Sequence, residues 1–125
     1  IPALEWFIQQ FQIHSKITCN CFFGKESVNL SSEESSTIFR IVQEVFTNIA
    51  RHSKADTVKV NMTENDGHII FNIKDNGVGF SQDNNSGKIS FGILGMKERA
   101  ISIGAEFTIV SSPGNGTEIS LILKS

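Results

Sequence analysis

The spacing of hydrophobic residues near the beginning of the chain predicts a helix followed by a strand. Within residues 3–13, apolar side chains recur three and four positions apart, after a proline that suits a first helical position. Within residues 16–23, apolar side chains occupy alternate positions until Gly24, as in a strand with one covered face. The apolar positions are Leu4, Phe7, Ile8 and Phe11 in the helix and Ile17, Cys19, Cys21 and Phe23 in the strand.

A long amphipathic helix is predicted next. Ser31 offers a hydroxyl that can cap a helix, and Glu34 stands three residues later, as in a capping box. Helical spacing of the apolar residues then continues to about Ser53. These apolar residues are Ile38, Ile41, Val42, Val45 and Ile49.

Two hairpins are predicted in the rest of the chain. Residues 58–62 and 69–73 each alternate between apolar and polar side chains, and Asn65-Asp66-Gly67 separates them as a turn. Residues 107–110 and 119–123 form a second such pair around a turn at 113–116.

Between the hairpins, the sequence predicts a loop and then a helix. Residues 81–90 are rich in Ser, Asn, Asp and Gly and predict an exposed, mobile loop. Residues 95–103 predict a helix that ends at Gly104.

This order of elements, in which paired strands outnumber helices, predicts an α+β fold. We expect a two-layer α/β sandwich, with a mixed, mostly antiparallel sheet and helices on one face. The 125 residues, of which 39% are hydrophobic, suffice for one core, so we predict a single domain over residues 1–125. Because the chain begins with Ile1 rather than methionine, we expect it to be part of a longer protein.

Charge and cysteine content narrow the class of function. The chain has 11 basic and 13 acidic residues, which argues against a nucleic-acid-binding protein. No long apolar run and no signal-peptide pattern occur, so we expect a cytoplasmic domain without direct membrane contact. Cys19 and Cys21 are interpreted as reduced core cysteines rather than as a zinc or redox site, since no second pair accompanies them.

The first candidate for chemistry is the segment from Asp75 to Phe80, which reads Asp-Asn-Gly-Val-Gly-Phe. Asp75 has the same strand parity as the apolar residue Ile73, so its carboxylate points to the covered side of the sheet. A buried carboxylate needs donors, and the amino group of adenine is one. The alternative interpretation is an aspartate that caps a β-turn.

Polar residues along the long helix form the second candidate. At about 100° per residue, these side chains lie on one stripe beside the apolar face. A carboxylate and an amide oxygen suit Mg²⁺, and basic groups suit phosphate, although a solvated polar face would look similar. The residues are Glu44, Asn48, Arg51 and His52.

Two further segments carry glycines near an expected ligand. Phe91 to Arg99 is predicted to be a glycine-containing loop that opens a helix, where free backbone N–H groups can meet phosphate, unless it is a plain junction. Thr117 follows Gly116 and has the parity of the covered face, a position that ordinary strand packing also explains.

Together and in this order, these segments resemble the ATP-binding catalytic domain of bacterial sensor histidine kinases, within the GHKL superfamily. Glu44 to Ser53 is similar to the N box of that family, Asp75 to Phe80 to its first glycine box, and Gly92 to Met96 to its second. The motifs Asn-x-x-Arg-His-Ser and Gly-Met-Lys-Glu-Arg resemble those of the subfamily paired with LuxR-type response regulators.

The resemblance implies a Bergerat-type ATP-binding fold and roles for individual residues. Asn48 would ligate Mg²⁺, Glu44 would act near the reacting phosphate, and the basic pair after them would position phosphates. Asp75 would bind the adenine amino group, with Thr117 assisting. The implied nucleotide-binding residues are Asn48, Arg51, His52, Asp75, Gly77, Gly79, Gly92, Gly95, Met96 and Thr117.

The resemblance also implies partners and leaves alternatives. The phosphate acceptor would be a histidine on a separate dimerisation domain of the parent protein, which passes the phosphoryl group to a response regulator. None of His14, His52 and His68 has the sequence context of that acceptor. Ser90 also stands where many relatives have glycine. The alternatives are another GHKL ATPase or serine kinase, and a degenerate, non-catalytic docking module.

Overall fold

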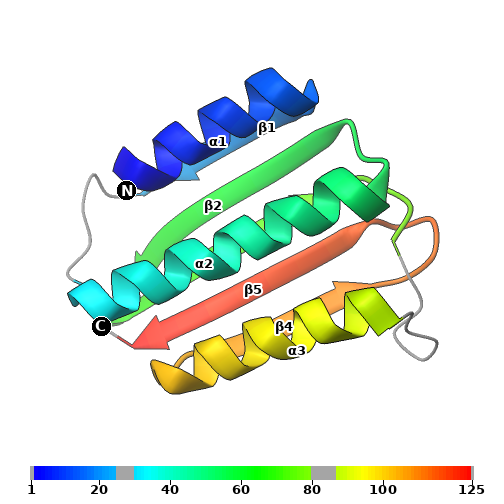
Figure 1. Ribbon diagram of the computed structural model, residues 1–125. Coiled ribbons are helices and arrows are strands. Elements are labelled where there is room, and N and C mark those ends of the chain that lie inside the picture. The colour runs from blue at the N-terminus through cyan, green and yellow to red at the C-terminus, as the bar shows by residue number, and fades with distance from the viewer. Residues whose placement is uncertain (1, 25–29, 80–86, 125) are drawn as a thin grey trace.

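The computed structural model describes residues 2–24, 30–79 and 87–124, which form a sheet covered on one face by helices (Figure 1). The helices are α1 (Pro2–Ser15), α2 (Ser32–Asn48) with the π-helical turn η1 (Ile49–Ser53), and α3 (Gly87–Ser102). The strands are β1 (Thr18–Phe23), β2 (Thr57–Asn65), β3 (His68–Asp75), β4 (Glu106–Ser111) and β5 (Thr117–Lys124).

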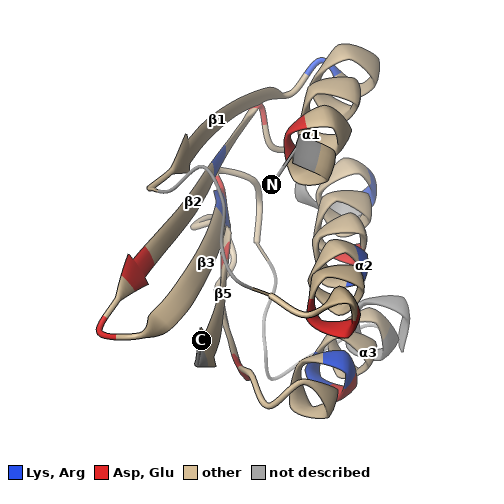
Figure 2. Ribbon diagram, turned by 90° about the vertical axis from the view of Figure 1, so that its left-hand side faces the viewer, with Lys and Arg blue, Asp and Glu red and all other residues tan. Residues whose placement is uncertain are grey.

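The sheet has the strand order β1-β2-β3-β5-β4. β1 pairs with β2 in parallel, and the other pairs are antiparallel. The parallel pair is joined through α2, because neighbouring parallel strands need a crossover connection. Figure 2 shows the two layers edge-on, with the sheet in one layer and all three helices in the other. The predicted α+β sandwich with a mixed, mostly antiparallel sheet is therefore confirmed.

The core lies between α2 and the inner face of the sheet. α2 starts with the predicted capping box, in which Ser31 Oγ accepts from the N–H of Glu34 and the Glu34 carboxylate accepts from the N–H of Ser31. Its apolar stripe then packs on alternate residues of the central strands, and each such buried side chain contributes roughly 1.5–3 kcal/mol. The buried residues of α2 are Ile38, Ile41, Val42, Val45 and Phe46, and those of the strands include Val58, Val60, Ile69, Phe71, Ile119 and Leu121.

Aromatic packing attaches α1 to α2. Phe11 lies edge-on to Phe46 with ring centroids 4.7 Å apart, and Phe7 contacts both Phe39 and Phe46 in the same manner. In the described part of the chain, no helix is long and apolar enough to span a membrane.

The prediction of an irregular segment before the third helix is wrong for residues 87–94, which belong to α3. Of the predicted mobile loop, residues 81–86 lie outside the described residues. The helix starts early because Ile93, Met96 and Ala100 keep helical spacing, and Met96 and Ala100 are fully buried. Burial of this face offsets the cost of about 1 kcal/mol for each helical glycine.

The two cysteines differ in environment. Cys19 packs against the core as predicted, whereas Cys21 is exposed, contrary to the prediction of a core cysteine. β1 is an edge strand, so its side chains are covered incompletely. Both thiols are free, and burial raises the pKa of the Cys19 thiol to about 11.

Candidate functional site

Asp75 ends β3 with its side chain turned inward, as strand parity predicts, and only 4% of its surface is exposed. Its Oδ1 accepts a hydrogen bond from the N–H of Gly77 at 2.8 Å, and the backbone N–H of Thr117 also donates to the carboxylate. Burial raises the pKa of this carboxyl, while the two N–H donors act in the opposite direction. The site therefore keeps an acidic group at a covered position with part of its accepting capacity unused.

Thr117 and Ser111 continue from Asp75 across the sheet. Strand register places Asp75 opposite Thr117 on β5, and Thr117 opposite Ser111 on β4. The Ser111 hydroxyl lies 2.8 Å from the Thr117 hydroxyl and donates to the carbonyl of Gly116 at 3.1 Å. Ser111 was not predicted, although it shares parity with the inward residues Phe107 and Ile109. That parity is the signal that could have identified it.

The turn after Asp75 requires glycine at one of the predicted positions. Gly79 has φ +65°, and a Cβ there would overlap the carbonyl of Ser112 and lie 2.8 Å from the carbonyl of Gly116. The N–H of Gly114 donates to the carbonyl of Val78 at 2.6 Å. The first glycine segment and the β4–β5 turn are thus packed backbone to backbone.

The residues predicted for the metal and phosphate end of the site lie where α2 meets α3. Glu44 and Asn48 lie one turn apart on α2 and are partly exposed. A Cβ added to Gly92 of α3 would lie 2.9 Å from Glu44 Oε1 and 3.4 Å from Asn48 Nδ2. Both side chains therefore occupy the space that a side chain at position 92 would fill. Because the amide group of Asn48 can flip, either its oxygen or its nitrogen can face a ligand.

The remaining predicted residues have varied surroundings. Arg51 is exposed on η1, and the His52 side chain lies outside the described residues. Gly95 faces the guanidinium of Arg99, which would be 3.2 Å from an added Cβ, and Met96 is fully buried in the core. Because Gly92 and Gly95 lie inside α3, the expected glycine loop at a helix N-terminus is wrong for these residues.

Residues 33–125 match the family described as histidine kinase-, DNA gyrase B-, and HSP90-like ATPase. The chain belongs to this ATPase family. Among similar proteins, the sensor histidine kinase YhcY of Bacillus subtilis (strain 168) is 40% identical over 94 residues, which cover 75% of this chain and 25% of that protein. The sensor protein VraS of Staphylococcus aureus (strain COL) is 44% identical over 82 residues, which cover 66% of this chain and 23% of that protein. The ATPase domain thus spans about a quarter of the length of these relatives.

Solved structures share the fold of this ATPase domain. The blue-light activated histidine kinase of Erythrobacter litoralis EL346 aligns with a TM-score of 0.80 at 20% identity, covering 97% of this chain and 40% of that one. Full-length ShkA, solved in complex with AMPPNP, aligns with a TM-score of 0.75 at 13% identity, covering 94% of this chain and 27% of that one. At these identities the likeness establishes the fold alone.

Asn76 is a further residue of the ATPase domain that sequence reasoning missed. Its Oδ1 accepts from the N–H groups of Asp56 and Thr57, and its Nδ2 donates to the Asp56 carboxylate at 2.6 Å. The latter bond lowers the pKa of Asp56. Asn76 thereby ties the segment after η1 to the end of β3. The C-terminal end of α2 and the start of β5 lie at the same end of the sheet (Figure 1).

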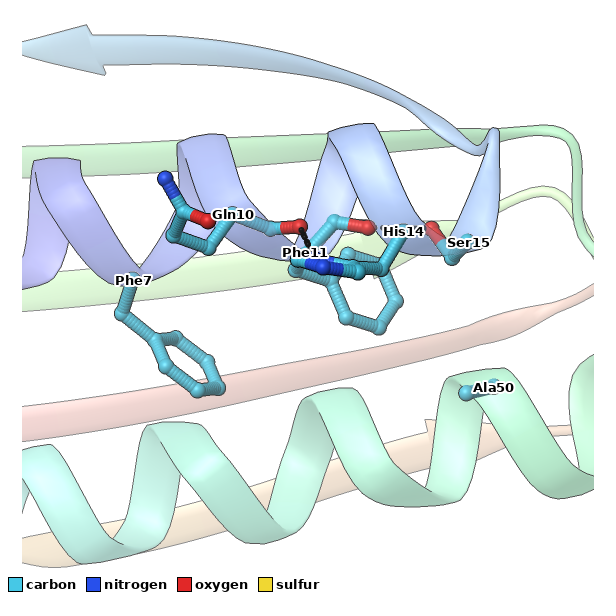
Figure 3. A pocket seen from close by; sticks show the side chains of 6 residues that line it. All are labelled: Phe7, Gln10, Phe11, His14, Ser15 and Ala50. Carbon is cyan, nitrogen blue, oxygen red and sulfur yellow. Dashed lines mark hydrogen bonds between the residues drawn. The ribbon is translucent and has the colours of Figure 1, made fainter.

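Two hollows have different relations to Asp75. One of about 430 Å³ lies at the end of the sheet that carries Asp75, and it includes Lys59 and Lys74. The other, of about 450 Å³, lies between α1 and η1, the turn that continues α2, and is called the α1–α2 groove here (Figure 3). Among the described residues that line it, none belongs to the predicted site, although His14 is held there by a 2.8 Å contact between Nδ1 and the carbonyl of Gln10. The groove is lined by Phe7, Gln10, Phe11, His14, Ser15 and Ala50.

Proposed function

We propose that this domain binds ATP with Mg²⁺ and donates the γ-phosphoryl group to a histidine on a separate dimerisation domain of its parent sensor kinase. Membership of the ATPase family and the similarity to the sensor proteins YhcY and VraS support this proposal. ShkA, which shares the fold, was solved in complex with AMPPNP, an ATP analogue, and this complex is further support.

The observation that carries the proposal is the environment of Asp75. This carboxylate is covered and accepts backbone N–H bonds from Gly77 and Thr117, while burial acts against its charge. A buried charge of this kind costs stability and is a recurrent feature of binding sites. The amino group of adenine is a neutral donor of suitable size for the remaining acceptor positions of the Asp75 carboxylate. Thr117 lies beside Asp75 in the sheet.

Glu44 and Asn48 fit the metal end of the ligand. A carboxylate and an amide oxygen are hard donors, and Mg²⁺ uses few protein ligands when it also binds phosphate oxygens. Both side chains are partly exposed beside Gly92, so a ligand can reach them from solvent. Bound Mg²⁺ would neutralise phosphate charge, and phosphoryl transfer needs chiefly such positioning and charge stabilisation. Arg51 and His52 follow on η1, where they would contact phosphates.

In this proposal the phosphate acceptor lies elsewhere in the parent protein, and the response regulator is a separate partner. Within the described residues, His14 and His68 bond through Nδ1 to the backbone carbonyls of Gln10 and Asp66. We infer that the acceptor histidine belongs to the dimerisation domain and that a response regulator then receives the phosphoryl group. The resemblance of this chain's motifs to one kinase subfamily suggests a regulator of the LuxR type. The domain would act in the cytoplasm, where ATP and the regulator are present.

Calorimetric titration of this chain with ATP and Mg²⁺ tests the proposal. Asp75→Asn should weaken ATP binding by at least about tenfold, because a charged acceptor becomes a group that also presents donors. Asp66→Asn is the matched control, since Asp66 is an exposed turn residue with a positive φ that asparagine tolerates. Absence of ATP binding by the folded wild-type chain, or equal loss in both variants, would contradict the proposal.

A further inference from the structure

Three side chains form a row across the sheet at the end of β3. Asp75, Thr117 and Ser111 are direct partners in the strand register and face the helical layer. Ser111 is 7% exposed, and its hydroxyl reaches both the Thr117 hydroxyl and the Gly116 carbonyl. The row is therefore a hydrogen-bonded extension of the site around Asp75.

The proton positions in this row follow from donor counting. A carbonyl oxygen only accepts, so the contact with Gly116 requires the single hydroxyl proton of Ser111. The 2.8 Å contact between the two hydroxyls is then a hydrogen bond only if Thr117 donates to Ser111. In this arrangement Thr117 presents lone pairs, and no proton, to a ligand.

We propose that Ser111 is a positioning residue that holds the Thr117 hydroxyl as an acceptor, so that Thr117 and Asp75 together select purine nucleotides carrying an amino group at C6. The inference rests on the proposed ATP binding and specifies how the base is discriminated. A 6-amino purine offers donors to both side chains. A 6-oxo purine, such as inosine or guanine, places a carbonyl opposite two acceptors, which is unfavourable because buried polar groups then remain unpaired.

The covered position of Ser111 favours this role over ordinary packing. The neighbouring inward residues of β4 are Phe107 and Ile109, which are apolar. A hydroxyl at such a position costs free energy unless it is bonded, and an apolar residue would avoid that cost. Both bonds of Ser111 to the β5 end serve to orient Thr117 and the preceding carbonyl.

The affinities of ATP and inosine triphosphate, measured with Mg²⁺ by calorimetry, test the proposal. The wild-type chain should prefer ATP, and Ser111→Ala should lower the ATP-to-inosine-triphosphate affinity ratio about fivefold, because the Thr117 proton becomes free to donate to a 6-oxo group. In a Thr117→Val background, Ser111→Ala should change the ratio by less than about twofold. Ser120→Ala, which removes a β5 hydroxyl bonded to Asn72, is the matched control and should leave the ratio unchanged.

The outcomes separate this inference from the proposed function. If the folded wild-type chain binds neither nucleotide, the proposed function and the inference both fail. If it binds ATP but the affinities for ATP and inosine triphosphate are equal, only the inference is overturned. The same holds if Ser111→Ala lowers the two affinities by the same factor. A ratio change that persists in the Thr117→Val background also overturns it. Should Ser111→Ala not fold, Ser111→Cys keeps the side-chain size with a weak acceptor and should lower the ratio in the same direction.

Discussion

Asp75 is a residue whose burial lowers the free energy of unfolding while it provides an acceptor for a ligand. Its carboxylate is covered, and burial raises its pKa despite two backbone donors. A raised pKa means that the native chain holds the proton more tightly than the unfolded chain. The ionised carboxylate therefore lowers the free energy of unfolding above the native pKa, and this cost disappears as the pH falls below the ordinary value of 3.8.

Asp75→Asn should accordingly keep or raise thermal stability at about pH 7, while it weakens ATP binding. The advantage over wild type should shrink when both are compared at about pH 4.5, because the wild-type carboxyl becomes partly protonated there. Thermal unfolding of both proteins at the two pH values measures this. Destabilisation of the variant by more than about 1 kcal/mol at pH 7 would show that Asp75 has mainly a structural role.

Asn48 is the residue at which the metal assignment can be tested. Asn48→Ala should reduce the gain in ATP affinity that Mg²⁺ provides, because one oxygen ligand is lost. Titrations with and without Mg²⁺ measure that gain. Asn61→Ala, at an exposed position on β2, is the control and should behave as wild type. An unchanged Mg²⁺ effect in Asn48→Ala would refute the assignment.

At the scale of elements, the contact between α2 and α3 joins fold and site. Gly92 and Gly95 both lie inside α3, where glycine costs about 1 kcal/mol relative to alanine. They differ in what faces them. A Cβ at Gly92 would press on Glu44 and Asn48, whereas one at Gly95 would meet only the flexible end of Arg99. Gly92 is therefore explained by the polar residues that it accommodates.

The two alanine variants should separate these effects. Gly95→Ala should raise the free energy of unfolding by roughly 0.5–1 kcal/mol through helix propensity. Gly92→Ala should gain less, because Glu44 Oε1 lies 2.9 Å from the new Cβ and must shift, and it should weaken Mg²⁺-ATP binding. Urea unfolding and calorimetry measure the two effects. Equal stabilisation, with full ATP affinity in Gly92→Ala, would contradict the described packing of Glu44 and Asn48.

At the scale of the whole molecule, periodicity was sufficient for most of the fold. Alternation in β2, β3 and β5 and the apolar stripe of α2 predicted the sandwich, because burial of one face dictates these patterns. The start of α3 could not be predicted, since glycines at 87, 92 and 95 and the polar residues before them resemble a loop. Burial of Met96 and Ala100 in the core, with Ile93 packed against it, stabilises that helix.

The candidate site was predictable to a similar extent. Strand parity placed Asp75 and Thr117, and helical spacing placed Glu44 and Asn48. Parity indicates that Ser111 points inward, but its bonds to the β5 end depend on strand register, and the role of Asn76 depends on contacts between distant segments. The π-helical turn also ends the regular 100° spacing after Asn48, so the direction of Arg51 could not be inferred from the α2 stripe.

The measurement that tests the central claim most directly is a map of backbone amide NMR shifts during titration with ATP and Mg²⁺. The amides of Gly77 and Thr117, which bond to the Asp75 carboxylate, should show the largest changes, together with those near Asn48. Amides of the α1–α2 groove, such as that of Phe11, should change little. Shifts centred on the groove, or no shifts at saturating ATP, would contradict an adenine site at Asp75.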